Sequence, residues 1–175
     1  MLIKHIYSVV ILISMKKHTA PKMVAKTCIA VKNSKIHGRG VFVKKEIPKG
    51  AAIIEYVGER ISWKEALRRH PHDPNQPNHT FYFSLEGGGV IDAKVGGNAA
   101  RWINHSCSPN CEVEETKIDG VGRVFIFAKR KLIPGEELFY DYSLSLDEKP
   151  SKKLREEYQC HCGNKKCRGT MLDLD

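Results

Sequence analysis

The sequence lacks a hydrophobic run long enough to cross a lipid bilayer. Its longest mostly apolar stretch, residues 6–15, has ten residues, whereas a membrane-spanning helix needs about 20. Lys16, Lys17 and His18 follow this run, where a signal peptide would have small residues. A membrane protein and an ordinary secretory leader are therefore disfavoured. Residues 1–26 are expected to be a separate lead-in, poorly ordered or a loosely packed helix, and later methionines allow part of it to be a translation-start artefact.

Acidic residues are nearly absent from the first third of the chain. Residues 1–50 carry eleven Lys and Arg but a single acid, Glu46, for a net charge of +10. Residues 51–175 carry eighteen Lys and Arg and nineteen acids, for a net charge of −1. The positive field could attract nucleic acid or an acidic partner surface, or it could merely keep the chain soluble.

The cysteines are unevenly placed along the chain. The six cysteines are Cys28, Cys107, Cys111, Cys160, Cys162 and Cys167. The last three form C-x-C-x4-C, which points to a metal before a disulfide, because a bridge within C-x-C would close a small, strained ring. Structural zinc needs four ligands. From the spacing, the fourth could be Cys107, Cys111 or His161, and free or bridged thiols remain the alternative.

The remaining sequence predicts one mostly β domain without an internal repeat. Apolar or β-branched runs bounded by glycine and proline predict strands at 28–31, 41–43, 51–57, 80–85, 90–92, 123–128 and 138–142. The capping-box pattern at residues 62–65 predicts a helix over 63–69, and a proline-rich loop follows at 70–78. Residues 98–103 are expected to make a helical turn, and residues 149–157 to be helical or flexible.

Residues 101–111, R-W-I-N-H-S-C-S-P-N-C, follow neither the period of a strand nor that of a helix. They combine Arg101, Asn104 and His105 with two cysteines and with turn signals. Backbone amides and polar side chains are therefore presented to a ligand, or else the stretch is only a polar surface loop.

A second segment, residues 135–142, carries two tyrosines. Tyr140 and Tyr142 are two positions apart, so on a strand they face the same side. Aromatic packing is the alternative explanation. A third segment, Gly38-Arg39-Gly40, is by itself only a weak signal, since it could simply make a turn.

Five motifs in order resemble those of the SET-domain protein lysine methyltransferases that carry a post-SET zinc tail. They are H-G-R-G-V-F, E-Y-V-G-E, G-N-x-A-R-W-I-N-H-S-C-x-P-N-C, P-G-E-E-L-F-Y-D-Y and C-x-C-G-x3-C-R-G. The resemblance covers roughly residues 27–172 and is strongest to the histone-lysine branch.

The resemblance implies a fold of small β-sheets (the β-clip fold) with a knot-like threading near the C-terminus and a zinc-bound tail. It places the lead-in at 1–26, the SET domain at 27–147 and the post-SET zinc-binding segment at 148–175. In this family S-adenosylmethionine binds on one face, the target lysine enters from the other, and a narrow channel joins them.

The resemblance also assigns roles to residues on the cofactor side. Contacts with S-adenosylmethionine are implied for His37, Gly38, Arg39, Gly40, Arg101, Asn104, His105 and Tyr142. Asn104 and His105 would hold the methionine part and the adenine, and Arg101 would support the loop or touch the cofactor. Most relatives have tryptophan or a similar residue where Arg39 stands, so this chain departs from the pattern there.

On the lysine side, Tyr142 matches the family's catalytic tyrosine and Tyr56 a tyrosine that lines the lysine channel. Tyr140 stands where relatives have phenylalanine or tyrosine, and its hydroxyl would occupy room that a growing methylamine needs. Mono- or dimethylation is therefore expected. Another channel tyrosine is usual near the start of the next strand, where this chain has Phe81 followed by Tyr82.

The resemblance further implies one structural zinc ion held by Cys107, Cys160, Cys162 and Cys167, with Cys111 packed as a small residue. The expected function is S-adenosylmethionine-dependent methyl transfer to a lysine of a protein, a histone tail being the expected substrate. The expected enzyme is a monomer that contacts no membrane and works in the nucleus at chromatin, or in a host nucleus or bacterial cytoplasm if the source is a bacterium.

A basic enzyme should not attract a basic histone tail. Either the lead-in is remote and leaves a near-neutral domain, which is the preferred explanation, or the basic N-terminus contacts DNA of a nucleosome. Two other functions are considered: a catalytically silent SET-fold zinc module that binds a peptide or nucleic acid, and a zinc-ribbon nucleic-acid binder. The presence of Tyr142 together with Asn104 and His105 argues against both.

Overall fold

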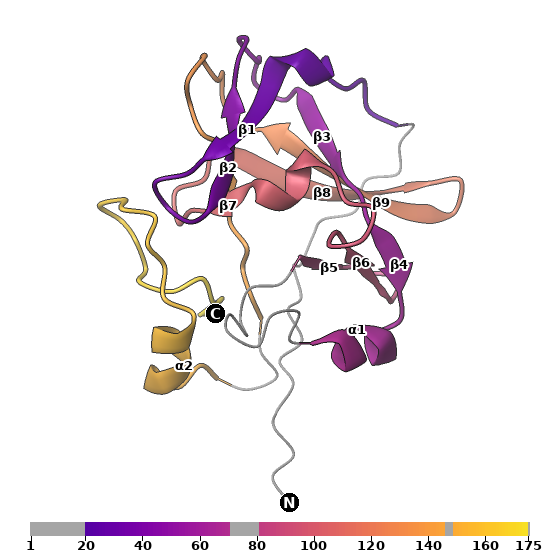
Figure 1. Ribbon diagram of the computed structural model, residues 1–175, viewed down its shortest axis with the longest axis vertical. Coiled ribbons are helices and arrows are strands. Elements are labelled where there is room, and N and C mark those ends of the chain that lie inside the picture. The colour runs from indigo at the N-terminus through magenta and orange to yellow at the C-terminus, as the bar shows by residue number, and fades with distance from the viewer. Residues whose placement is uncertain (1–19, 71–80, 146–148, 175) are drawn as a thin grey trace, which may run out of the picture.

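The computed structural model describes residues 20–70, 81–145 and 149–174. Most of the predicted lead-in and most of the predicted loop at 70–78 lie outside the described residues. Within them, regular structure consists of four sheets of two or three strands, two short α-helices and two 3-10 turns. The predicted mostly β architecture of small sheets is confirmed (Figure 1). No helix in the described ranges is both long and apolar enough to span a membrane.

Two antiparallel sheets form the upper part of the molecule in Figure 1. Their strands are β1 (Ile29–Asn33) with β2 (Arg39–Val43), and β3 (Ala52–Tyr56) with β9 (Val121–Ala128) and β8 (Cys111–Ile118). The hairpin from β8 to β9 turns at Asp119 and Gly120, which both have positive φ. The prediction found β9 but missed β8, because five of the eight residues of β8 are charged or threonine and hide its period.

A third sheet carries the first helix. It consists of β4 (Glu59–Ile61), β6 (Val90–Asp92) and β5 (Tyr82–Ser84), and α1 (Trp63–Arg69) lies beside it in Figure 1. The helix begins after Ser62, whose hydroxyl accepts a hydrogen bond from the Glu65 amide at 3.2 Å. The predicted cap and helix bounds are therefore confirmed. The Tyr82 hydroxyl donates to the Ala66 carbonyl at 3.1 Å, so Tyr82 is directed toward this helix.

The fourth sheet joins the two segments that the sequence singled out. β7 (Asn104–His105) pairs in parallel with β10 (Phe139–Tyr140). The side chain of Asn110 locks this pairing, because its amide donates to the Glu137 carbonyl and accepts from the Phe139 amide, both at 2.8 Å. The predicted threading of the two segments is thus confirmed, although only two residues of the predicted 138–142 strand are in strand geometry.

Two short 3-10 helices precede strands β1 and β7. The turn predicted at 98–103 is the 3-10 helix η2 (Ala99–Trp102), and η1 (Lys26–Cys28) precedes β1. Asn98 caps η2 by accepting from the Ala100 amide at 3.0 Å, and its own amide donates to the Glu55 carbonyl of β3 at 2.8 Å. The segment that leads into β7 is therefore anchored to the sheet of β3, β9 and β8.

The core has two parts. The larger fills the space between the sheets and includes Val41, Ile47, Phe83, Ile103, Val124, Ile126, Leu132 and Leu138, all at most 1% exposed. The smaller consists of Leu144, Leu154, Tyr158 and Leu172, and holds α2 (Lys152–Glu157) and the C-terminal segment. Tyr142 packs against both parts, so it lies where the tail meets the rest of the protein.

Candidate functional site

Asn104 lies at the centre of the candidate site. Its amide nitrogen donates to the carbonyls of His37 at 3.3 Å and Arg39 at 2.8 Å, and to the Glu137 carboxylate at 3.1 Å. All three partners are acceptors, so the amide nitrogen faces them and the amide oxygen points the other way. The structure therefore brings the predicted loop at residues 37–40 against the N-H-S-C segment.

His105 connects Asn104 to the last tyrosine. The ring is buried, and burial lowers its pKa to about 4, so the imidazole is neutral at pH 7. Its Nδ1 accepts a hydrogen bond from the Tyr142 amide at 3.1 Å, and the two rings pack edge to face at 5.4 Å. The Cys107 sulfur lies 3.4 Å from Nε2. His105 thus positions the backbone of Tyr142 rather than presenting its ring to solvent.

Three tyrosines gather beside this pair. The Tyr142 hydroxyl donates to the Ile103 carbonyl at 2.8 Å, and the Tyr56 hydroxyl donates to the Phe81 carbonyl at 2.8 Å. The Tyr140 and Tyr142 rings are 4.9 Å apart. Burial raises the pKa of all three phenols well above the usual value, and their mutual proximity adds to this for Tyr56 and Tyr140. All three are neutral at pH 7, and the bonded hydroxyls keep oxygen lone pairs free to accept.

The ring of Trp102 is contacted by two arginines. The guanidinium of Arg39 is 5.1 Å from the ring centroid and that of Arg101 is 4.7 Å from it, and Phe81 meets the same ring edge-on at 5.3 Å. Arg101 donates to the Ala93 carbonyl at 3.0 Å. Its Nε is the one buried side-chain nitrogen or oxygen among the described residues without a hydrogen-bond partner. Arg101 therefore supports the loop, with one donor left over.

Gly40 leaves room for a side chain that the sequence did not single out. A Cβ at this position would lie 2.1 Å from a carboxylate oxygen of Glu137. The same carboxylate accepts from Asn104, so the missing side chain of Gly40 makes room for that contact. Gly38 is required for a different reason, because its φ of +46° is left-handed.

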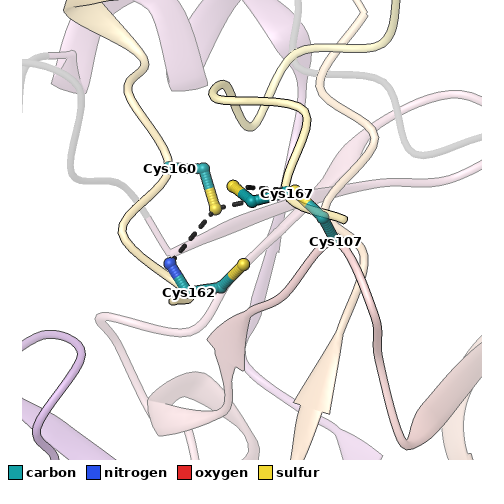
Figure 2. A group of neighbouring side chains, drawn as sticks. All are labelled: Cys107, Cys160, Cys162 and Cys167. Carbon is teal, nitrogen blue, oxygen red and sulfur yellow. Dashed lines mark hydrogen bonds between the residues drawn. The ribbon is translucent and has the colours of Figure 1, made fainter. Parts of the chain in front are cut away.

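Four cysteines converge at the edge of this site (Figure 2). The sulfurs of Cys107, Cys160, Cys162 and Cys167 all lie within 4.8 Å of one another. Cys107 comes from the loop after β7 and the other three from the tail, and its sulfur is 3.6 Å from that of Cys160 and 3.8 Å from that of Cys167. Tetrahedral zinc with bonds of about 2.3 Å would separate its sulfur ligands by roughly 3.8 Å.

The surroundings of the sulfurs also fit a metal. Backbone amides donate to two of them, Cys162 N to Cys160 at 3.4 Å and Gly169 N to Cys167 at 3.3 Å, as expected around thiolate ligands. Among the described residues, neither Cys111 nor His161 belongs to the group. Cys111 is buried beside Asn110 instead. The sequence left the fourth ligand open between three residues, and the structure brings Cys107 to that place.

Besides the cysteine group, an ion pair joins the C-terminal tail to the segment of Tyr140 and Tyr142. Arg168 forms a two-fold ion pair with Asp141 at 2.5 and 2.7 Å, and also donates to the carbonyls of Met171 and Leu172. Asp141 stands between Tyr140 and Tyr142, and Arg168 follows a member of the cysteine group. Local sequence patterns do not reveal this pair, because the two residues are 27 positions apart and neither is unusual alone.

Comparison with known proteins agrees with this geometry. The family model of the SET domain matches residues 38–143. The histone-lysine N-methyltransferase trithorax of Drosophila virilis is 38% identical over 152 residues, 87% of this chain and 4% of that protein. Histone-lysine N-methyltransferase ash1 of Drosophila melanogaster is 42% identical over 134 residues, 77% of this chain and 6% of the relative. Histone-lysine N-methyltransferase 2B of Homo sapiens is 37% identical over 147 residues, 84% of this chain and 5% of the relative.

A solved structure has a similar fold. It is described as ctPRC2 in an autoinhibited conformation bound to S-adenosylmethionine, and it aligns with a TM-score of 0.61 at 30% sequence identity. The alignment covers 66% of this chain and 15% of that one. This chain therefore spans only a small part of the length of the curated relatives and of the solved chain that it matches.

Proposed function

The chain belongs to the SET-domain family, and from this premise we propose that it is an S-adenosylmethionine-dependent protein lysine methyltransferase. A histone is the proposed substrate, because the relatives are named as histone-lysine N-methyltransferases. The observation that carries the proposal is that Asn104 binds the loop at residues 37–40 while its neighbour His105 packs against the partly buried Tyr142.

On the cofactor side, S-adenosylmethionine would supply a methyl group carried on a sulfonium. The loop of His37, Gly38, Arg39 and Gly40 would offer backbone groups, and the Asn104 amide oxygen is free to accept from an ammonium because its nitrogen is engaged. Arg101 supplies the adjoining wall through its stack on Trp102. His105 and Tyr142 are the remaining residues proposed to line the cofactor site. Gly40 would contribute mainly by leaving space for the Glu137 side chain.

On the lysine side, the residues need to align a neutral amine. A free lysine has a pKa near 10.4, and a dry channel favours its uncharged form. The hydroxyls of Tyr142 and Tyr56 each donate a hydrogen bond to a backbone carbonyl, so each oxygen can accept a hydrogen bond from the amine. Neutral phenols orient the amine without trapping an ammonium as a carboxylate would, and such alignment can supply several kcal/mol.

One structural zinc ion, held by Cys107, Cys160, Cys162 and Cys167, is proposed to fasten the tail to the site. The tail would then form one wall beside Tyr142, which already packs against its apolar residues. The proposed division is a SET domain at 27–147 and a post-SET segment at 148–175. A nuclear, chromatin-associated location follows from the proposed substrate, and a monomer is the proposed state.

The activity is tested by transfer of tritiated methyl groups from S-adenosylmethionine to core histones. The unaltered chain should label them, and Tyr142→Phe should lower kcat about a hundredfold because the aligning hydroxyl is lost. S-adenosylhomocysteine should raise the melting temperature of both proteins. A catalytically silent module would show neither labelling nor this stabilisation, and either absence would contradict the proposal.

The number of methyl groups is tested separately through Tyr140. Its ring lies 4.9 Å from that of Tyr142 and is buried, so its hydroxyl is proposed to occupy room beside the amine and to stop the reaction at mono- or dimethyllysine. Tyr140→Phe should increase the trimethylated product in mass spectra of the modified histone. A predominantly trimethylated product from the unaltered enzyme would rule out this role.

A further inference from the structure

Most of the Lys and Arg of the N-terminal third lie within the part of the chain that the structure describes. Eight of the eleven Lys and Arg of residues 1–50 fall within the described residues 20–50. The sequence alone favoured a remote basic lead-in and a near-neutral domain. The positive field instead includes a large contribution from segments around η1, β1 and β2.

Three chain segments bring part of this charge together. The amides of Lys44 and Lys45 donate to the Cys28 carbonyl at 2.7 and 3.3 Å, which fastens the turn after β2 to the end of η1. Ile47 and Leu132 exchange backbone hydrogen bonds at 3.0 and 2.9 Å, which places the same turn against the turn after β9. Cations from opposite halves of the sequence thus share one surface.

We define the basic cluster as the exposed cations of these segments, together with Lys22, whose neighbour Met23 forms a bridge with Ala52 just after the turn that follows β2. The eight members are Lys22, Lys26, Lys44, Lys45, Lys49, Lys129, Arg130 and Lys131. Two nearby acids are already paired, Glu46 with Lys131 at 2.9 Å and Glu136 with Arg130 at 2.6 Å. A third, Glu112, is exposed on β8 next to the end of β9. Within the described part of the chain, the other six lysines form no ion pair, so the surface keeps a clear excess of positive charge.

We propose that the basic cluster binds the phosphate backbone of double-stranded DNA. This rests on the proposed function in one respect, since a histone substrate in a nucleosome carries DNA beside it. Lysine ammonium groups on flexible stems suit phosphates, whose contacts give affinity without sequence preference.

The composition of the surface favours duplex DNA over other partners. The three segments contain no aromatic side chain on which single-stranded bases could stack. Ile133 is the large hydrophobic residue exposed beside them, which is too little for the apolar centre of a protein interface. Charge is therefore the dominant property of this surface.

The cluster is separate from the residues proposed for methyl transfer. None of its eight members is among the residues that contact Asn104, the tyrosines or the cysteine group. Substitutions in the cluster should therefore leave the reaction on a free histone unchanged. This separation allows the two proposals to fail independently.

The test measures binding of the full chain to a fluorescent DNA duplex of mixed sequence over a range of salt concentrations. The variant is Lys44→Glu/Lys45→Glu/Lys49→Glu. The control, Lys64→Glu/Lys152→Glu/Lys153→Glu, makes the same change in net charge on α1 and α2, which lie at the other end of the molecule in Figure 1. The cluster variant should lose at least about tenfold in affinity, and the slope of log K against log salt should fall by about 3.

The control should bind nearly as well as the unaltered chain. Equal losses in both variants would overturn the proposal, since only net charge would matter, and so would tighter binding of an RNA duplex or single strand through the same lysines. Methylation should fall for the cluster variant on nucleosomes but not on free histones. The chain could bind DNA through the cluster and yet methylate no histone substrate. That result would support this inference and refute the proposed function.

Discussion

At the scale of single residues, the site depends on how one amide is oriented. Asn104 donates to three acceptors, and the Glu137 carboxylate is the one supplied by a side chain. Glu137 reaches it only because Gly40 has no Cβ. The orientation of the Asn104 amide therefore depends on the Glu137 carboxylate, and Glu137 is best described as a positioning residue.

Gly40→Ala should weaken cofactor binding. The new methyl group would displace Glu137, and losing a charge-assisted hydrogen bond to Asn104 should cost about 1.5 kcal/mol, or roughly tenfold in the dissociation constant for S-adenosylhomocysteine. Isothermal titration measures this directly. Gly87→Ala is a matched control, because a Cβ there meets nothing within 4 Å. Unchanged affinity in Gly40→Ala would show that Glu137 does not orient Asn104.

The sequence predicted many of these residues but not their partners. Asn104, His105 and the tyrosines stand in recognisable motifs, so the resemblance alone marked them. Glu137 was passed over within P-G-E-E-L because a carboxylate in a turn is ordinary. Its importance comes from a contact across 33 positions with Asn104, which local sequence patterns do not encode.

At the scale of elements, the parallel pair of β7 and β10 is the junction through which the tail acts on the site. The two residues after β10 contact different parts of the protein. Asp141 forms an ion pair with Arg168 of the tail, and the Tyr142 hydroxyl donates a hydrogen bond to the Ile103 carbonyl. Strand β8, which follows the central loop, was missed from the sequence because it is rich in glutamate. Its hydrogen bonds with β9 decide its conformation, and these are tertiary contacts.

Arg168→Ala should loosen the junction. The side chains of the pair are about one quarter exposed, so the loss of unfolding free energy should be about 1–2 kcal/mol, between surface and buried pairs. The value of kcat should fall more than KM for the histone rises, because Tyr142 is displaced. Chemical denaturation and steady-state kinetics measure the two effects.

Arg68→Ala is the matched comparison, since Arg68 pairs with Glu65 on the exposed face of α1. Because this pair is exposed to solvent, the substitution should leave both the melting temperature and kcat nearly unaltered. If both substitutions had the same small effect on kcat, the ion pair between Arg168 and Asp141 would be merely structural.

At the scale of the whole molecule, the fold is two small cores joined across Tyr142. The larger core is built from sheets, whereas the smaller depends on a few residues around Leu172 and on the cysteine group. So small a core cannot hold a segment firmly by burial alone. The tail is therefore expected to need its metal, as small zinc-binding segments generally do.

The purified chain should contain one zinc ion, measured by atomic emission. Cys162→Ser should reduce the zinc content and the melting temperature, because one of four ligands is lost. Cys28→Ser should retain the full zinc content, since Cys28 lies outside the group. Full zinc content in Cys162→Ser would contradict the assignment of the ligands.

A tail held by a metal is proposed to complete a site that transfers methyl groups to lysine. The most direct test is mass spectrometry of core histones after incubation with S-adenosylmethionine and the full chain, before and after a chelator removes zinc. The zinc-bound protein should place methyl groups on a lysine ε-amine, this activity should be lost after chelation, and added zinc should restore it. Histones that stay unmodified under both conditions, or methylation that persists undiminished without zinc, would contradict this proposal.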